Sequence, residues 1–211
     1  MTAGVSGADF RQMLVFFKEK LVIFATTKTG STALQGALMA HASMTMRSPP
    51  GLKHMNVRRY QRILEPSLRE LGAPKKLETF ALIRHPLDWL SSWYRYRSRN
   101  ELLGQPQSTR DVTFNDFVLE YLADDPAPFA NVGKQSNFLI GHDGQVGIDH
   151  LYQYEMYPSA LRFLSHKLGL DIETNQRNVS PAFSVNLDAD IKARLQDECR
   201  LEFDLWEIAQ R

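Results

Sequence analysis

The sequence contains a single cysteine, Cys199, which excludes an internal disulfide and a metal site built from several thiolates. It also lacks a long apolar run, because the runs at residues 13–17 and 21–25 are split by the charged residues 18–20 and are far too short to span a bilayer. No basic stretch followed by an apolar one opens the sequence, so we expect no signal peptide. These absences favour a protein of the reducing cytoplasm without an integral membrane segment.

A strong net charge is missing as well. The formal charge is +1, so no global field indicates a nucleic acid or a membrane as partner. The charge is unevenly spread, since residues 47–99 hold twelve Lys and Arg against four Asp and Glu. This local basicity suits an anionic ligand, although solvated helix faces explain it equally well. With 211 residues, 43% hydrophobic and 23% charged, the chain fits one globular domain, residues 1–211.

Strand and helix patterns alternate along the chain. Two uninterrupted β-rich runs, at residues 21–25 and 79–83, are typical of strands covered on both faces, and weaker strand patterns lie at 43–47 and just before Tyr154. Helices are expected at residues 31–40, 56–71, 84–99, 114–122, 135–140, 160–168 and 187–209. The alternation predicts a three-layer α/β fold with a central parallel sheet of about four to five strands flanked by helices. Ligands of such sheets collect at the carboxyl ends of the strands.

The segment that joins the first strand to its helix reads "TTKTGSTALQGAL", residues 26–38. Backbone N–H groups and the dipole at a helix N-terminus favour a bound anion. Gly30 allows the backbone to approach such a ligand closely, and Lys28 adds a positive charge. Ser31 and Thr32 can donate hydrogen bonds from their hydroxyls. The segment therefore predicts an oxyanion-binding loop.

The loop is not a Walker A loop. That ATP-binding motif, G-x-x-x-x-G-K-[ST], has its lysine after the second glycine, whereas Lys28 precedes Gly30 and Ala25 stands where the first glycine would be. No acidic residue suited to magnesium ends the strand at 79–83, which runs into Arg84 instead. A nucleotide kinase with a degenerate loop remains the main enzymatic alternative.

Arg84 supplies a second anion-binding group. It follows a buried-type strand, so it should stand close to the loop at Lys28. Ser92 lies eight residues further on and shares a helix face with Arg95 and Arg99. Arg84 and Ser92 offer a guanidinium fork and a hydroxyl to a second anion, although either residue alone is as easily structural. Two anion sites at adjacent strand ends suit a nucleotide with two separate charged ends.

In this order, the motifs resemble those of the sulfotransferases that use 3′-phosphoadenosine 5′-phosphosulfate (PAPS). "TTKTGST" is similar to their 5′-phosphosulfate loop, and "ALIRHPLDWLSSWYRYR" is similar to their 3′-phosphate segment. "LYQYEMYPSALRFLSHKLGL" resembles their tyrosine–glutamate strand end with its following helix, and "NVSP" resembles a recurrent C-terminal loop. The resemblance covers residues 21–209 and implies a P-loop NTPase-like sulfotransferase fold.

The resemblance implies a role for each matching residue, with PAPS as co-substrate. Lys28 would contact the 5′-phosphosulfate and steady the leaving phosphate. Amides and hydroxyls around that group would come from the rest of the loop, namely Thr29, Gly30, Ser31 and Thr32. Arg84 and Ser92 would bind the 3′-phosphate. Because one lysine and oriented amides can stabilise the charge of this reaction, no metal is expected.

The implied reaction transfers the sulfuryl group to a hydroxyl acceptor by in-line displacement and releases adenosine 3′,5′-bisphosphate. His54 is our choice for the general base, since an imidazole has a reference pKa of ~6.5, although a partly exposed histidine at a helix start is the plain alternative. His85 and Glu155 are expected to be structural. Arg177, just before "NVSP", is a further candidate for the 3′ end of the nucleotide.

The acceptor is expected to be a carbohydrate. The order of the motifs resembles the carbohydrate branch of the family, and basic and aromatic residues lie between the cofactor motifs. A lipid-linked or phenolic acceptor stays open, as does the oligomeric state. A non-catalytic module that binds 3′,5′-bisphosphate nucleotides is the alternative outside enzymology.

Overall fold

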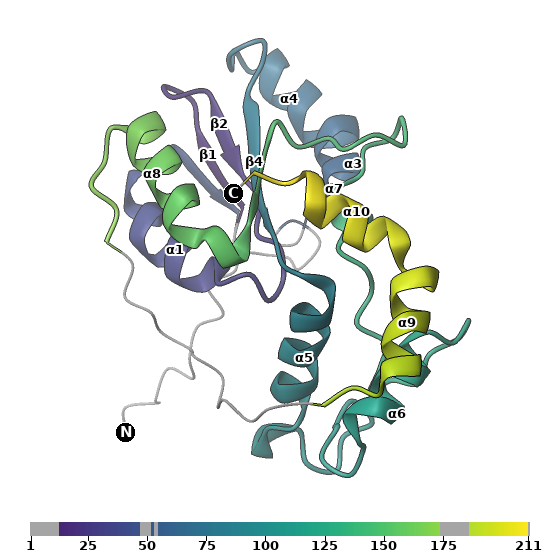
Figure 1. Cartoon of the computed structure of the whole chain (residues 1–211). Helices are drawn as coiled ribbons and strands as arrows, with labels where there is room; N and C mark the ends of the chain where they lie inside the picture. The colour runs from purple at the N-terminus through teal and green to yellow at the C-terminus, as the bar shows by residue number, and fades with distance from the viewer. Residues whose placement is uncertain (1–12, 47–51, 53–54, 174–185, 211) are drawn as a thin grey trace, which may run out of the picture.

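The structure is a computed structural model that describes residues 13–46, 52, 55–173 and 186–210. A five-stranded sheet lies at its centre (Figure 1), with the strands in the order β3-β1-β2-β4-β5. The strands are β1 (Met13–Phe16), β2 (Leu21–Ile23), β3 (Met44–Met46), β4 (Glu78–Ile83) and β5 (His150–Gln153).

The sheet is mixed rather than wholly parallel. β2, β4 and β5 pair in parallel as expected, whereas β1 pairs antiparallel with both β2 and β3. A turn at residues 17–20 joins β1 to β2, and so short a connection permits only a hairpin. The predicted parallel arrangement is therefore confirmed for β2, β4 and β5. β1 lies where we expected only a short apolar run, and it adds an antiparallel strand to the sheet.

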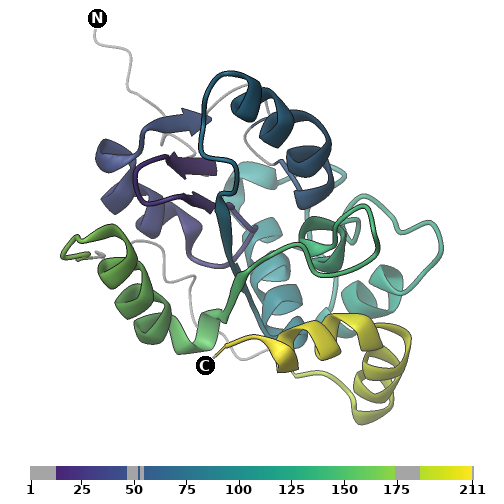
Figure 2. The ribbon, with the colours of Figure 1, turned by 90° about the horizontal axis from the view of Figure 1, so that it is seen from above.

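Helices cover both faces of the sheet and continue beyond its carboxyl edge. They are α1 (Ser31–Leu38), α3 (Val57–Arg59), α4 (Glu65–Glu70), α5 (Pro86–Arg97), α6 (Phe114–Tyr121), α7 (Ser136–Leu139), α8 (Tyr157–Leu168), α9 (Ala189–Glu198) and α10 (Arg200–Ile208). Figure 2 shows α1 and α8 on one side of the sheet and α3, α4 and α7 on the other. The expected three-layer α/β fold is confirmed.

The strands are buried on both faces, which explains their uninterrupted apolar runs. Along β1, Leu14 and Phe16 pack against α1 and α8, while Met13 and Val15 belong to the core on the opposite face. A third apolar cluster joins α5 to α6 and α9 below the carboxyl edge. This cluster fixes α5 where the strands end.

Two expected helices are interrupted. The helix expected at residues 56–71 contains a π-helical segment, η2 (Tyr60–Leu64), because Pro66 in the first turn of α4 has no N–H to donate to the preceding turn. The helix expected at 187–209 is divided into α9 and α10 at Cys199, whose φ is −111°.

No helix in the described part of the chain is long and apolar enough to cross a membrane. Within the same residues, no three His, Cys, Asp or Glu side chains gather as the ligands of a metal ion would.

Candidate functional site

The loop between β2 and α1 is tied to the neighbouring strand. The Thr26 hydroxyl donates to the Leu82 carbonyl over 2.6 Å, and the Thr29 hydroxyl donates to the Thr26 carbonyl over 3.0 Å. Both threonine side chains are buried, and their hydroxyl oxygens lie 2.9 Å apart. The loop thus holds its shape through its own hydrogen bonds. We expected the Thr29 hydroxyl to face the ligand, but it forms hydrogen bonds within the loop. The backbone amide of Thr29 is left to contact a ligand.

The loop contains two residues with left-handed backbone, Lys28 with φ 62° and Gly30 with φ 66°. Gly30 is the N-cap of α1, and no side chain of the described residues caps that end. The amides of Ser31 and Thr32 therefore open the helix without an acceptor inside it. A left-handed residue other than glycine costs about 1–2 kcal/mol, and such strain concentrates at functional sites.

Replacing Gly30 by Ala is expected to destabilise the fold. An added Cβ would lie 2.9 Å from Cε2 of Tyr154, and the positive φ disfavours any side chain. We expect the free energy of unfolding in urea to fall by about 2 kcal/mol. Gly36 in the same helix is the matched control, since a Cβ there meets nothing within 4 Å. Gly36→Ala should stabilise the protein by about 1 kcal/mol, and equal effects of the two substitutions would contradict this conformation of the loop.

Arg84 follows β4 directly and reaches the loop. Its Nη1 donates to the Lys28 carbonyl over 3.3 Å, and its Cζ lies 4.9 Å from the ring centroid of Tyr154. Its Nε is buried and has no hydrogen-bond partner among the described residues. Because β2 and β4 pair in parallel, their carboxyl ends bring Arg84 to Lys28, as the sequence predicts.

Arg95, on α5, adds a second guanidinium. Its Nη1 donates to the Ser91 hydroxyl, while its Nε is buried without a partner in the described structure. Burial and the charge of Arg84 lower the pKa of Arg95, and Asp88 opposes this shift. Over the residues that the structure describes, neither Arg84 nor Arg95 forms an ion pair. Two neighbouring cations that form no ion pair favour a bound anion.

The side chain of Lys28 lies on the aromatic face of α5. Its Nζ is 4.2 Å from the ring centroid of Tyr96 and 5.5 Å from that of Trp93. Trp89 donates from Nε1 to the Thr27 carbonyl over 3.0 Å, which fastens the loop to the same helix. Loop, strand end and helix thus form one basic cluster, by which we mean Lys28, Arg84 and Arg95.

Comparison with protein families decides the class of the protein. The model described as "Sulfotransferase family" matches residues 11–196, which include the loop, β4 and α5. The chain belongs to the sulfotransferase family. The resemblance found in the sequence is therefore confirmed at the level of the family. Neither a search of curated proteins nor a search of solved structures returned a match.

The remaining predicted residues of the candidate site divide into two groups. Ser92 is buried in α5, about one helical turn before Arg95. His54 and Arg177 lie outside the described residues, so the general base and the closing arginine stay predictions.

His85 and Glu155 have the structural roles that we expected. The ring of His85 packs edge-on against Trp206, with centroids 4.8 Å apart, and against Phe203. Glu155 accepts a hydrogen bond from the His85 amide over 2.8 Å and from Trp206 Nε1 over 3.0 Å.

Sequence reasoning missed part of the candidate site. Arg95 was noted only for its helix face, although its spacing from Ser92 and its lack of an acidic neighbour at i±4 were readable signals. Tyr154, which borders Gly30 and Arg84, was recognised only as a strand end. Gln135 contacts the backbone of Arg84 from 51 residues away, and no local pattern marks it.

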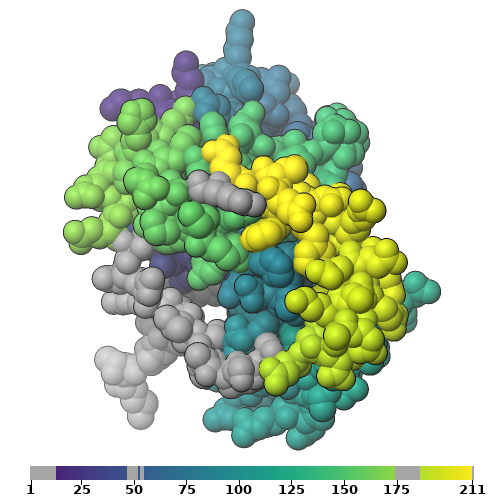
Figure 3. Space-filling view, viewed as in Figure 1, coloured from purple at the N-terminus to yellow at the C-terminus, as the bar shows by residue number. Residues whose placement is uncertain are grey.

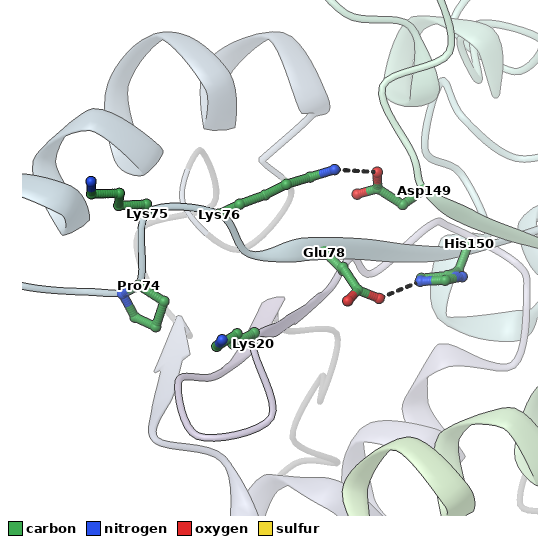
Figure 4. Close-up of a pocket in the computed structure, with 7 residues that line it drawn as sticks. All are labelled: Lys20, Pro74, Lys75, Lys76, Glu78, Asp149 and His150. Atoms are coloured by element: carbon green, nitrogen blue, oxygen red, sulfur yellow. Dashed lines mark hydrogen bonds and ion pairs between the residues drawn. The ribbon is translucent and has the colours of Figure 1, made fainter.

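The sulfotransferase also has a hollow of about 460 Å³ at the amino-terminal edge of β4 and β5 (Figure 4). It is lined by Lys20, Pro74, Lys75, Lys76, Glu78, Asp149 and His150. The acidic side chains of the hollow already form ion pairs. The Glu78 carboxylate lies 2.8 Å from Lys167 Nζ and 2.6 Å from His150 Nε2, and these two groups lower the pKa of Glu78. Asp149 lies 3.5 Å from Lys76. No predicted site residue borders this hollow, so it is not the candidate site.

Proposed function

We propose that the protein transfers the sulfuryl group of PAPS to a carbohydrate hydroxyl and releases adenosine 3′,5′-bisphosphate. The family supports sulfuryl transfer in general. PAPS as the donor is supported by the basic cluster, in which the buried Nε atoms of Arg84 and Arg95 have no partner among the described residues. Such unpaired buried donors favour a ligand that brings its own negative charge.

The residues fit both charged ends of PAPS. At the loop, the amides of Thr29 and Gly30 and the open N-terminus of α1 would bind the 5′-phosphosulfate. The hydroxyls of Ser31 and Thr32 would donate further hydrogen bonds to the same group. At the end of β4, Arg84 and Ser92 would bind the 3′-phosphate, and Arg95 would add its charge beside Arg84.

Lys28 would stabilise the charge that develops during transfer. PAPS, when bound, supplies an activated sulfuryl group attached to a phosphate oxygen. Negative charge grows on that oxygen as its bond to sulfur breaks, and the Lys28 ammonium with the loop amides would lower the energy of this state. A sulfuryl group carries less negative charge than a terminal phosphoryl group, so one lysine and oriented amides can do what kinases achieve with magnesium.

The acceptor side of the proposal rests on His54, chosen from the sequence, and on Arg99 with Tyr96. His54 would take the proton of the acceptor hydroxyl, for which its imidazole must be neutral. Arg99 is exposed two residues beyond the end of α5, with its Cζ 4.7 Å from the ring centroid of Tyr96. A cation next to an aromatic face suits a sugar that already carries negative charge. The single-domain organisation and the cytoplasmic location stay predictions from the sequence.

Calorimetric titration tests the proposal before any acceptor is known. We expect adenosine 3′,5′-bisphosphate to bind about 100-fold more tightly than 5′-AMP, which lacks the 3′-phosphate, and than ADP with magnesium. Preference for ADP with magnesium would favour the kinase-like alternative and overturn the proposal. Tight bisphosphate binding without transfer from PAPS to any member of a saccharide panel would identify a binding module instead.

A further inference from the structure

The backbone of Arg84 is held by a side chain from another part of the chain. The Arg84 amide donates to Oε1 of Gln135 over 3.0 Å, and Nε2 of Gln135 donates to the Arg84 carbonyl over 2.8 Å. The Gln135 side chain thus acts on the end of β4 as a neighbouring strand would, with one donor and one acceptor. Because both backbone groups of Arg84 are fixed, the direction in which its side chain leaves the strand is fixed too.

Gln135 is in turn fixed by Glu202 of α10. The carboxylate of Glu202 accepts the amide of Gln135 over 2.9 Å and the amide of Ser136 over 3.2 Å. Gln135 and Glu202 are each only 4% exposed. Burial raises the pKa of Glu202, while the hydrogen bonds from Ser136 and Gln135 oppose the rise. Burying a carboxylate costs free energy unless it accepts such hydrogen bonds. The two amides at the start of α7 therefore fix the position of the Glu202 side chain.

His85, the residue after Arg84, is also held through contacts with α10. Glu155 accepts from the His85 amide and from Trp206 of α10, as described above. Gln153, at the end of β5, donates from Nε2 to the Trp206 carbonyl over 2.9 Å. Figure 3 shows the yellow surface of α10 between the green surface that follows β5 and the teal surface of α5. Both residues that follow β4 are therefore supported from α10.

We infer that Gln135 is a positioning residue for Arg84 and that Glu202 holds Gln135 in place for this purpose. The inference rests on the proposed function, because it assigns to Arg84 the 3′-phosphate. It goes beyond the family assignment, because the family match ends at residue 196 and α10 begins at Arg200. The support keeps the guanidinium at the loop, so little conformational freedom is lost when the anion binds.

The chemistry of the contact requires an amide. Gln135 accepts from an N–H and donates to a C=O at the same time. A glutamate would keep the acceptor but set a carboxylate oxygen against the Arg84 carbonyl. A methionine fills nearly the same volume and makes neither bond. Gln135→Met and Gln135→Glu therefore change the contact with little change in packing.

The test is a double-mutant cycle, read by calorimetric titration with adenosine 3′,5′-bisphosphate and with 5′-AMP. We expect Gln135→Met to weaken binding of the bisphosphate about 10-fold. Without the two hydrogen bonds Arg84 can shift, and a small displacement of a binding group lowers affinity strongly. Binding of 5′-AMP should change less than about 2-fold, because only the 3′-phosphate contact is disturbed. In an Arg84→Ala background, Gln135→Met should have no further effect on the bisphosphate, since it acts through Arg84.

A second variant and a control guard against loss of folding. Glu202→Gln leaves the Gln135 side chain intact and should weaken bisphosphate binding about 3-fold, again only when Arg84 is present. Leu139→Ala removes a buried side chain of α7 without touching the hydrogen bonds to Arg84. It should lower the melting temperature and leave both affinities within about 2-fold at a temperature well below that midpoint.

The outcomes separate this inference from the proposed function. Equal weakening of both nucleotides, additive effects of Gln135→Met and Arg84→Ala, or a loss in Leu139→Ala equal to that in Gln135→Met would overturn the positioning role alone. Wild-type protein that does not bind the bisphosphate would overturn the proposed function and this inference with it.

Discussion

Arg84→Ala is expected to weaken binding of adenosine 3′,5′-bisphosphate by about 100-fold, which corresponds to about 2.7 kcal/mol. The guanidinium offers charge-assisted hydrogen bonds, and its buried Nε has no competing partner within the described residues. The substitution leaves the backbone contacts of residue 84 with Gln135 intact, so the end of β4 should keep its shape. The loss is therefore expected in affinity rather than in stability.

Calorimetric titration measures this effect, with 5′-AMP as the second ligand. Affinity for 5′-AMP should change by less than about 3-fold, because that nucleotide lacks the group assigned to Arg84. Arg200→Ala is the matched control, since its side chain is 82% exposed and lies 3.9 Å from Asp204. Indifference of the bisphosphate to Arg84→Ala would refute the assignment of the 3′-phosphate to this residue.

Lys28→Met is expected to lower kcat by about 100- to 1,000-fold, as the loss of one preorganised donor does in other enzymes. Methionine is unbranched like lysine and only one atom shorter, so it can occupy most of the space beside Tyr96 and Trp93. The positive charge and its N–H donors are lost, and they are needed most when the bond to the leaving oxygen breaks. Affinity for the bisphosphate product should fall by no more than about 10-fold.

Release of the bisphosphate from PAPS in the presence of a saccharide acceptor measures this rate. Lys18→Met is the control, because Lys18 is exposed in the turn between β1 and β2 and lies outside the basic cluster. Unchanged kcat in Lys28→Met would show that the loop amides alone stabilise the leaving group. A proportional loss of kcat and of affinity would assign Lys28 to binding in general.

The loop and the position of Arg84 could be predicted because their signals are local. A strand, a short turn with Lys28 and Gly30, and a helix follow one another within residues 21–38. Parallel pairing of β2 with β4 then brings Arg84 to the loop by geometry alone. The helix expected after Arg84 was also marked locally, by Pro86 in its first turn and its aromatic spacing.

The rest of the fold and site depends on contacts that no local pattern encodes. β1 has an uninterrupted apolar run, and its period alone does not distinguish a buried antiparallel strand from any other buried segment. The left-handed Lys28 is held by the hydrogen bonds of Thr26 and Thr29 to their surroundings, not by its own preference. The role of Gln135 depends on a carboxylate 67 residues further along the chain.

The bonds at the end of β4 have a consequence for the time at which the site forms. They join Arg84 to Gln135, Gln135 to Glu202 and His85 to Glu155, all distant in sequence. Closing such long loops is slow, so these contacts should form late in folding. On the ribosome, the loop between β2 and α1 would emerge early but stay without its aligned arginine until α10 has been made. A nucleotide that binds only the folded protein would then stabilise chains in which these contacts have formed, by an amount that rises with the logarithm of its concentration once that exceeds Kd.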